Sequence, residues 1–307
     1  MRGKFIFLAV EVTVLEMAAL GIIWKNNVLD GSFLPVVIIM GVGLVLLLLQ
    51  GYFNIVKPYT EKVRVLEAAA NESKEADLIR REFVANVTHE LKTPLTSISG
   101  FIETLQAGAA EDPEIRHKFI DIIAIETARL KRLIEDLLVL SDIENRRDSE
   151  GMEFDIKPAI ENTVEALKPI AENKGVEVIL DLQEGLFING SVDRFRQMMV
   201  NLIENAVKYS DEGGHIWIRS SKDADKIVVS VRDEGMGIAP EHHERLFERF
   251  YRVDKSRSKK AGGTGLGLSI VKHIAVLFGA SLKVESQVGE GAEFFVVFNV
   301  DDNLDDS

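Results

Sequence analysis

The segment FVANVTHELKTPLTSISGF, from Phe83 to Phe101, decides how the rest of the chain can be understood. Its apolar residues recur at alternating steps of three and four, the pattern of a helix packed against other helices. They are Val84, Val87, Leu91, Pro94, Ile98 and Phe101, followed by Leu105. His89 lies two residues after Val87, about 200° around the helix, so its imidazole is expected to point away from this apolar seam. The segment therefore predicts a packed helix that presents one histidine to other molecules.

The neighbours of His89 suit chemistry at an imidazole. Glu90 is an adjacent carboxylate that could hold the ring in one tautomer and raise its basicity. Thr93 and Ser97 follow one and two turns later on the same face. The position alone also fits an ordinary solvated histidine, so the rest of the chain has to decide between the two interpretations.

Composition limits the functions that are possible. The 307 residues allow about two domains with accessory segments. The net charge is −13 and the chain ends in DDNLDDS, so no binding of nucleic acid is expected. The absence of cysteine excludes disulfides, thiolate metal sites and cysteine nucleophiles.

Two long apolar runs, residues 5–24 and 33–56, open the chain. Each could span about 30 Å of hydrocarbon as a helix, which predicts a transmembrane hairpin with a short external loop at residues 25–32. Basic residues flank the hairpin at both outer ends, so both termini and the catalytic part are expected in the cytoplasm, at the inner or plasma membrane. Glu11 and Glu16 in the first run are expected to face a partner, the bundle interior or water. A signal peptide is the alternative for the first run.

Residues 57–76 predict a helical connector, and residues 77–148 a helical hairpin. In GAAEDP, between its two helices, Asp112 is the expected N-cap and Pro113 the first residue of a second helix that runs to about Arg147. The second helix has an apolar seam of its own, interrupted by one polar residue. This seam comprises Phe119, Ile123, Glu126, Leu130, Leu133, Leu137 and Leu140.

A lone helical hairpin with this much apolar surface leaves one side bare. Pairing of two copies into a four-helix bundle would cover that side, so we expect a homodimer. The alternative is that the following domain covers it.

The hydrophobic period changes after Met152, and residues 152–301 predict an α+β sandwich with helices over one face of a mixed sheet. Residues 302–307 form an acidic tail. Helical patterns fill residues 158–173, 192–208 and 266–278. Alternating patterns mark strands at residues 153–156, 176–182, 215–221, 226–233, 280–287 and 292–300.

Polar residues of the second helical pattern suit a metal and a polyphosphate. Asn201, Asn205 and Lys208 lie at helical steps of four and three, so their polar ends line one face. Asparagine oxygens are hard neutral ligands for Mg²⁺, and an ammonium group suits phosphates.

Two glycine-containing patterns follow. In DEGMGI, Asp233 can accept a hydrogen bond from an exocyclic amine, while Gly235 and Gly237 let the backbone come close to a flat ligand. In GGTGLGLSI a glycine run leads into a helix, which offers bare amides to an anion. The basic loop between these patterns is of the type that closes over a nucleotide, and Arg252 is its best candidate for the terminal phosphate.

Together and in this order, these patterns resemble the nucleotide-binding domain shared by histidine kinases, Hsp90-type chaperones, type II topoisomerases and MutL-type repair ATPases. GEGAEF, from Gly289 to Phe294, extends the resemblance, with alanine where that family usually has threonine. HELKTP resembles the phosphoacceptor segment of sensor histidine kinases. The chain from about Ala76 to Val300 thus resembles a membrane sensor histidine kinase of the phosphate-sensing, HisKA type.

This resemblance implies ATP and Mg²⁺ as cofactors. Asn205 would be the Mg²⁺ ligand, with Asn201 close to the metal and the phosphates. Asp233 would select adenine, and Tyr209 would lie near the base. The remaining nucleotide-binding residues would be Lys208, Gly235, Gly237, Arg252, Gly263, Thr264, Gly265, Leu266 and Gly267.

The expected function is ATP-dependent autophosphorylation of His89, followed by transfer of the phosphoryl group to an aspartate of a response regulator. Glu90 would orient His89 and take up proton charge, and a hinge near Glu150 and Gly151 would bring the two sites together. Thr93 completes an arrangement that resembles the HExxT motif of bifunctional kinases, which implies a phosphatase activity toward the regulator.

Two alternatives belong to other classes of protein. One is an ATPase of the chaperone or repair class that acts by conformational clamping, although such a protein has no need of HELKTP on an outward helix face. The other is a non-catalytic membrane scaffold, against which the intact asparagines and glycines argue.

Overall fold

A computed structural model describes residues 34–53, 57–145, 151–253 and 263–299, together with isolated positions between residues 14 and 25. The chain divides into two units, Met1–Glu82 and Phe83–Ser307.

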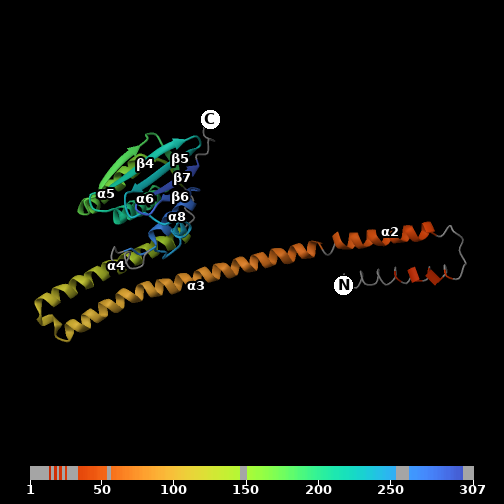
Figure 1. The fold of residues 1–307 in the computed structure, drawn as a ribbon, viewed down its shortest axis with the longest axis horizontal. Coiled ribbons are helices and arrows are strands. Elements are labelled where there is room, and N and C mark those ends of the chain that lie inside the picture. Colours follow the sequence, from red (N-terminus) through yellow and green to blue (C-terminus); the bar gives the residue numbers. More distant parts are fainter. Residues whose placement is uncertain are drawn as a thin grey trace. The chain divides into compact units, whose positions relative to one another are not determined.

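The first unit contains helix α2, Leu34–Gly51, and the beginning of helix α3, Lys57–Gln106 (Figure 1). The expected connector at residues 57–76 is helical, as part of α3. Most of the first apolar run, with Glu11 and Glu16, lies outside the described residues. Among the helices that are described, none combines the length and the apolar character needed to cross a membrane.

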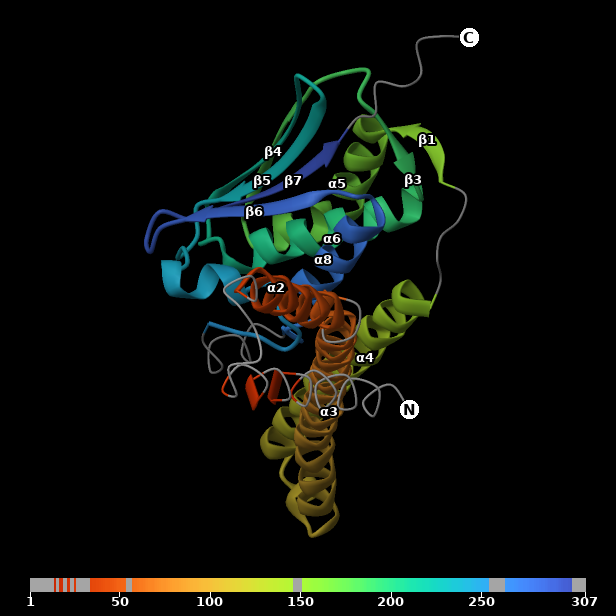
Figure 2. The same ribbon diagram turned by 90° about the vertical axis from the view of Figure 1, so that its right-hand side faces the viewer.

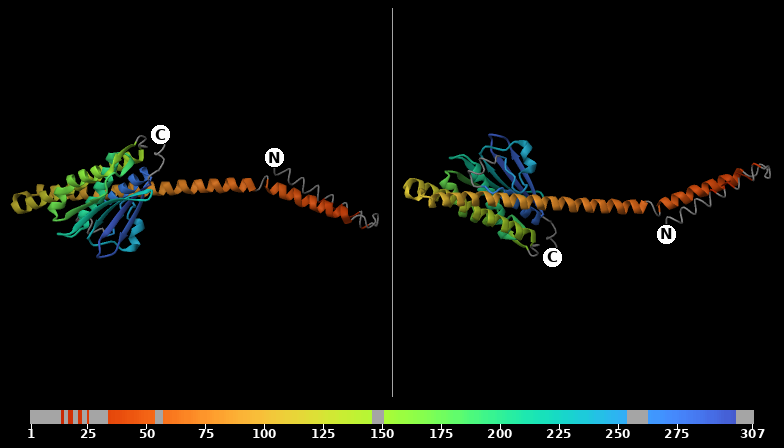
Figure 3. Two further views of the ribbon diagram at one scale, coloured as in Figure 1. Left: turned by 90° about the horizontal axis from the view of Figure 1, so that it is seen from above. Right: turned by 90° about the horizontal axis from the view of Figure 1, so that it is seen from below.

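The second unit begins with a helical hairpin. The part of α3 after Phe83 is followed by a short 3₁₀ helix, η3, Ala109–Glu111, and by α4, Pro113–Asn145, which returns alongside it (Figures 1 and 3). A carboxylate oxygen of Asp112 accepts hydrogen bonds from the amides of Glu114, at 2.9 Å, and Ile115, at 3.3 Å. The predicted N-cap at Asp112 and helix start at Pro113 are therefore confirmed.

The seam between the two helices is mostly as predicted. Phe101 and Phe119 face each other with ring centroids 4.9 Å apart, and Leu133 and Leu140 are buried. Val84 is the exception, because its side chain is 56 % exposed. Its predecessor Phe83 turns inward instead, about 100° around the helix, and its ring lies 5.9 Å from that of Phe250.

The α+β domain has a mixed five-stranded sheet in the order β2-β4-β5-β7-β6, in which β2 and β4 are parallel and the other pairs antiparallel. Three helices cover one face of this sheet (Figure 2). The strands are β2 Glu177–Leu182, β4 His215–Asp223, β5 Lys226–Asp233, β6 Ser281–Ser286 and β7 Ala292–Asn299. The helices are α5 Ile156–Asn173, α6 Val192–Tyr209 and α8 Gly267–Leu277, with the 3₁₀ helix η4 Pro240–Arg245 between β5 and α8.

A second sheet was missed by the sequence analysis. β1, Met152–Asp155, pairs antiparallel with β3, Phe187–Gly190. The four residues of β3 are too few for a visible alternation, and one of them is glycine. A strand was predicted at residues 153–156, but without a predicted partner strand it could not be assigned to a sheet.

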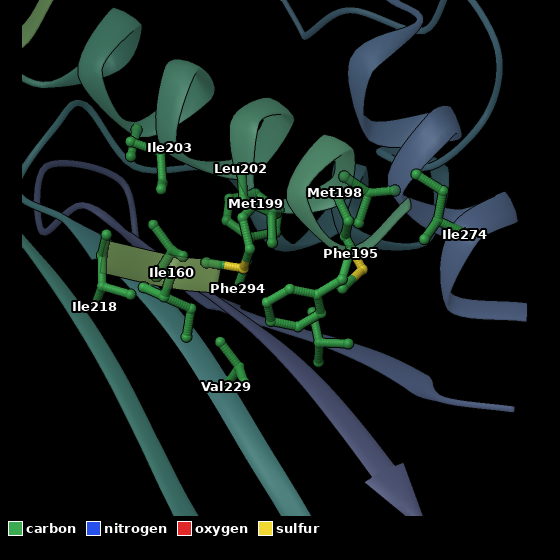
Figure 4. Packing of buried hydrophobic residues seen from close by; sticks show 14 of the residues in the cluster. Ile160, Phe195, Met198, Met199, Leu202, Ile203, Ile218, Val229, Ile274 and Phe294 are labelled. Carbon is green, nitrogen blue, oxygen red and sulfur yellow. The ribbon is translucent and has the colours of Figure 1, made fainter. Parts of the chain in front are cut away.

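The core of the domain lies between α6 and the sheet (Figure 4). Phe195, Met198, Met199 and Leu202 recur at helical spacing on α6 and are fully buried, whereas the polar residues of α6 lie on its other side. Each such side chain stabilises the fold by about 1.5–3 kcal/mol relative to exposure. This packing fixes the direction in which the polar face of α6 points.

Candidate active site

His89 lies on the surface of α3, as its spacing from Val87 predicts. The hydroxyl of Thr93, one turn later, donates to the backbone carbonyl oxygen of His89 at 3.1 Å. Thr93 therefore keeps its oxygen lone pairs as acceptors beside an exposed imidazole.

Glu90 differs from the expectation that it would hold the His89 ring. Its carboxylate accepts from the guanidinium of Arg129 at 3.0 Å and from that of Arg252 at 3.4 Å. The Arg129 and Arg252 side chains are 9 % and 7 % exposed, so both pairs are largely shielded from water. Two largely buried guanidinium groups attract the carboxylate more strongly than an imidazole on the surface, which explains the difference.

A cavity of about 880 Å³ lies between the polar face of α6, the loop after β5 and the start of α8. It collects most of the residues that the sequence predicted to bind a nucleotide. Those on its wall are Asn201, Asn205, Lys208, Tyr209, Asp233, Gly237, Arg252, Gly263, Thr264, Gly265 and Gly267.

The asparagines are placed by the helix that carries them. α6 begins at the N-cap Ser191 and buries its apolar side against the sheet, so Asn201 and Asn205 face the cavity. The side-chain amide nitrogen of Asn201 donates to the carbonyl oxygen of Gln197 at 2.9 Å, and the side-chain oxygen of Asn201 faces Gly267. A Cβ at Gly267 would lie 3.1 Å from that oxygen, so glycine allows α8 to begin this close to α6.

Two cations, Lys208 and Arg252, line the cavity and are close enough to interact electrostatically. Burial lowers the pKa of Lys208, whose ammonium lies 4.9 Å from the centre of the Tyr209 ring. Burial also lowers the pKa of Arg252, whose guanidinium donates to Glu90 and to the carbonyl oxygen of Gly263. An anionic ligand, such as the phosphates of a nucleotide, stabilises desolvated cations of this kind.

Asp233 is the buried carboxylate of the site, and burial raises its pKa. One of its oxygens accepts from the amide of Gly235 at 2.9 Å, and the amide of Ala292 also donates to the carboxylate. A carboxylate has about four lone-pair sites, so Asp233 can still accept from a donor in the cavity. An exocyclic amine is a donor of the expected kind.

The glycines of DEGMGI are also required for a reason that was not predicted. A Cβ at Gly235 would overlap the carbonyl oxygen of Tyr209, and one at Gly237 would overlap that of Gln287. Gly237 also has a φ of 66°. These glycines are thus required by close approach of the chain to itself, although Gly237 also lines the cavity.

The glycine run before α8 is confirmed as part of the cavity wall, with one correction. Gly265 has a φ of 77°, and its carbonyl oxygen accepts from the amide of Phe250 at 2.8 Å. Leu266, however, is fully buried, and its amide donates to the hydroxyl of Thr264 at 3.2 Å. Its side chain belongs to the hydrophobic core, and it is not among the residues that line the cavity.

Helix α4 also contributes to the cavity, which was not predicted. Arg132, Glu135, Asp136 and Val139 of α4 line the same cavity. The hydroxyl of Thr264 donates to the carboxylate of Asp136 at 2.6 Å, and burial raises the pKa of Asp136. These residues lie 128 positions apart, and no local pattern marks such a contact.

Some of the predicted elements lie outside the described residues. They include the middle of the basic loop, residues 254–262, and Glu150 of the expected hinge. Gly151 is described, and a Cβ there would overlap the backbone of Gly190. Within the described part of the chain, no group of three or more histidine, aspartate or glutamate side chains is arranged to hold a metal.

Comparison with known proteins gives two family matches. Residues 79–146 match the His Kinase A (phospho-acceptor) domain, and residues 190–302 match the histidine kinase-, DNA gyrase B- and HSP90-like ATPase.

Curated relatives include sensor histidine kinase WalK of Bacillus subtilis, 38 % identical over 223 residues, which are 72 % of this chain and 36 % of WalK. Sensor-like histidine kinase SenX3 of Mycolicibacterium smegmatis is 38 % identical over 216 residues, 70 % of this chain and 56 % of SenX3. The chain thus spans from about a third to a little over half of the length of these relatives.

Solved structures with the same fold include the Acinetobacter baumannii histidine kinase AdeS. It has a TM-score of 0.55 and 27 % identity, and the match covers 70 % of this chain and 98 % of AdeS. Histidine kinase ThkA, solved in complex with the response regulator protein TrrA, gives a TM-score of 0.60 and 27 % identity over 72 % of this chain and 61 % of ThkA.

Proposed function

Because the chain belongs to the histidine kinases, with their phosphoacceptor and ATPase domains in that order, we propose that it phosphorylates itself on His89 from ATP. One observation carries this proposal. The carboxylate that follows His89 reaches Arg252 on the wall of the nucleotide cavity, at 3.4 Å. The phosphoacceptor helix and the nucleotide site are therefore close enough to act together.

The residues of the cavity suit Mg²⁺ and ATP. Asn205 would supply an oxygen ligand, because Mg²⁺ in such sites takes one or two protein ligands and completes its shell with phosphates and water. Lys208, Arg252 and the amides at the start of α8 would hold the phosphates, and Asp233 would accept from the amine of adenine. When bound, ATP supplies the phosphoryl group and Mg²⁺ neutralises part of its charge.

The reaction proceeds by attack of the neutral imidazole of His89 on the γ-phosphorus. A P–N bond forms while the P–O bond to the departing ADP breaks, and the positive charge that develops on the ring is met by the carboxylate of Glu90. Glu90 must first exchange its partner Arg252 for the imidazole. The same exchange releases Arg252 for the phosphates.

We further propose that the product is passed to an aspartate of a cytoplasmic response regulator and that the kinase acts as a homodimer. ThkA, solved with its regulator TrrA, supports the first point. A stripe of exposed apolar side chains on the hairpin supports the second, since a second copy could cover it. The stripe consists of Val84, Leu95 and Ile102 on α3 and Ile120, Ile134 and Leu138 on α4.

Dephosphorylation of the same regulator is a second proposed activity, carried by Thr93. Its hydroxyl hydrogen is engaged with the carbonyl of His89, so its oxygen can accept from a water and orient it toward a docked phosphoaspartate. Thr93 orients that water and is not itself a nucleophile.

Attachment to the inner or plasma membrane is proposed from the sequence. The apolar runs at residues 5–24 and 33–56 and their basic outer flanks support it.

The proposed function is tested by incubating the full-length protein with γ-labelled ATP and Mg²⁺. Label bound to the protein should survive alkali and be lost in acid, and it should then pass to a response regulator of the same cell. Release of inorganic phosphate with no protein-bound label would favour the clamping ATPase, and failure to bind Mg·ATP would favour a scaffold.

A further inference from the structure

Lys174 lies outside every pattern that the sequence analysis selected, yet it lines the nucleotide cavity. It is half-buried at the end of α5. Its ammonium donates to two backbone carbonyl oxygens of α6, that of Val207 at 2.7 Å and that of Lys208 at 2.6 Å.

The position of Lys174 is fixed by the way in which α5 ends. The amides of Gly175 and Val176 donate to the carbonyl oxygens of Glu172 and Ala171, both at 3.0 Å. Gly175 has a φ of 69°, so these bonds form a Schellman motif with Lys174 as the C-cap. The side chain of Lys174 therefore starts from a backbone with little freedom.

The end of α6 needs a donor at this place. The last carbonyl groups of a helix have no partners within it and carry the negative end of its dipole. Ser210 satisfies the carbonyl of Ala206 through its amide, at 2.9 Å, and its hydroxyl, at 2.8 Å. Lys174 satisfies the next two carbonyls, so one ammonium closes the last turn of α6.

That last turn connects the two sides of the nucleotide site. It carries Lys208 and follows Asn205 on the phosphate side, and the carbonyl of Tyr209 lies directly against Gly235, in the loop that follows Asp233 at the end of β5. The charges that face Lys174 are the carboxylates of Asp211 and Asp233 and the ammonium of Lys208.

On the basis of the proposed function, we propose that Lys174 is a positioning residue for ATP, which fixes the last turn of α6 and thereby the separation between the phosphate-binding and adenine-binding residues. A ligand that needs both sides at once depends on this separation. A ligand that occupies the adenine side alone does not.

The test compares Lys174→Met and Lys174→Arg in the full-length protein, with Lys168→Met as the matched control. Lys168 is also a lysine of α5, but it is exposed and pairs with Glu165 at 3.9 Å. The dissociation constants of Mg·ATP and of adenosine are measured by calorimetry, and thermal unfolding is recorded for each variant.

Loss of two charge-assisted bonds predicts that Lys174→Met binds Mg·ATP about tenfold more weakly and adenosine within about twofold of the unchanged protein. Lys174→Arg, which can donate to the same carbonyls, restores most of the ATP affinity. Lys168→Met changes neither.

Three results would each overturn the role of Lys174 while leaving the kinase proposal intact. Lys174→Met could weaken the binding of ATP and adenosine equally, or leave the affinity for ATP unchanged. Lys174→Arg could also fail to restore the affinity for ATP. If the unchanged protein failed to bind Mg·ATP, the proposed function would fall, and the role of Lys174 with it.

Discussion

The helical hairpin and the α+β domain bury their apolar side chains to different extents. Between Phe83 and Asn145, Leu133, Leu140 and Ile143 are buried, whereas Leu95 and Leu138 are 57 % and 65 % exposed. The α+β domain contributes most of the core, including all the buried residues of α6. The buried residues of the hairpin belong to the same core cluster as those of the domain, but the hairpin leaves a larger share of its apolar side chains exposed. We infer that the domain holds the nucleotide site in a fixed geometry, whereas the hairpin contacts different surfaces at different times.

The largest effect is expected at the phosphoacceptor. His89→Gln should abolish phosphorylation while the affinity for ATP stays within about twofold, because substitutions at separate sites have independent effects. His117→Gln, at another exposed histidine of the hairpin, is the control and should behave as the unchanged protein. Phosphate incorporated by His89→Gln would mean that the acceptor has been misplaced.

Asn205→Ala should have the opposite pattern, since it removes the proposed metal ligand from the domain and leaves the hairpin unchanged. We expect autophosphorylation at limiting Mg²⁺ to slow by about a hundredfold. The rate is measured across a Mg²⁺ titration, with Asn189→Ala, an exposed asparagine of β3, as the control. An undiminished rate at limiting Mg²⁺ would count against the role of Asn205.

Thr93→Ala should separate two activities of the hairpin. Autophosphorylation should be kept, while loss of phosphate from the regulator slows by about ten- to a hundredfold, the range for losing one positioning contact. The decay of purified phospho-regulator is followed with ADP and each kinase variant. Equal decay with both proteins would show that Thr93 merely tolerates the proline that follows it.

The exposed stripe of the hairpin gives a fourth test. Leu138→Glu should weaken the dimer by about tenfold or more, because a carboxylate would lose its water at the interface. Val276→Glu places the same charge on α8 of the domain, where the valine is 70 % exposed, and should leave the dimer unchanged. Sedimentation at several concentrations measures both, and the reverse outcome would place the interface on the domain.

The smallest effect is expected where the hairpin holds the phosphate-binding loop. Asp136→Ala removes the acceptor of Thr264 and a negative charge from the cavity wall, so Mg·ATP should bind about three- to tenfold more tightly. Asp121→Ala, an exposed aspartate of the same helix, is the control. Calorimetry that finds weaker binding for Asp136→Ala would show that the contact supports the nucleotide site.

Local patterns predicted the features of this molecule that depend on local geometry. The outward direction of His89 follows from the angle per residue of a helix, and the cap at Asp112 from its place before Pro113. The polar face of α6 followed from steps of three and four, so Asn201, Asn205 and Lys208 were found together on the cavity wall.

Features that depend on distant contacts could not be predicted in this way. Glu90 meets Arg129 and Arg252, which lie 39 and 162 positions away. Gly235 is needed because Tyr209 comes close to it, and Leu266 is buried because α8 packs there. The ammonium of Lys174 caps a different helix, and a lysine at the end of α5 carries no local sign of that role.

The central claim is that the γ-phosphoryl group of ATP goes to His89, and locating the phosphate tests it most directly. The full-length protein is incubated with Mg·ATP, digested with trypsin at neutral or mildly alkaline pH, and analysed by mass spectrometry. The account predicts one phosphate on the peptide Glu82–Lys92, EFVANVTHELK, carried by His89. Phosphate on Thr88 of that peptide, or on any other peptide, would contradict it.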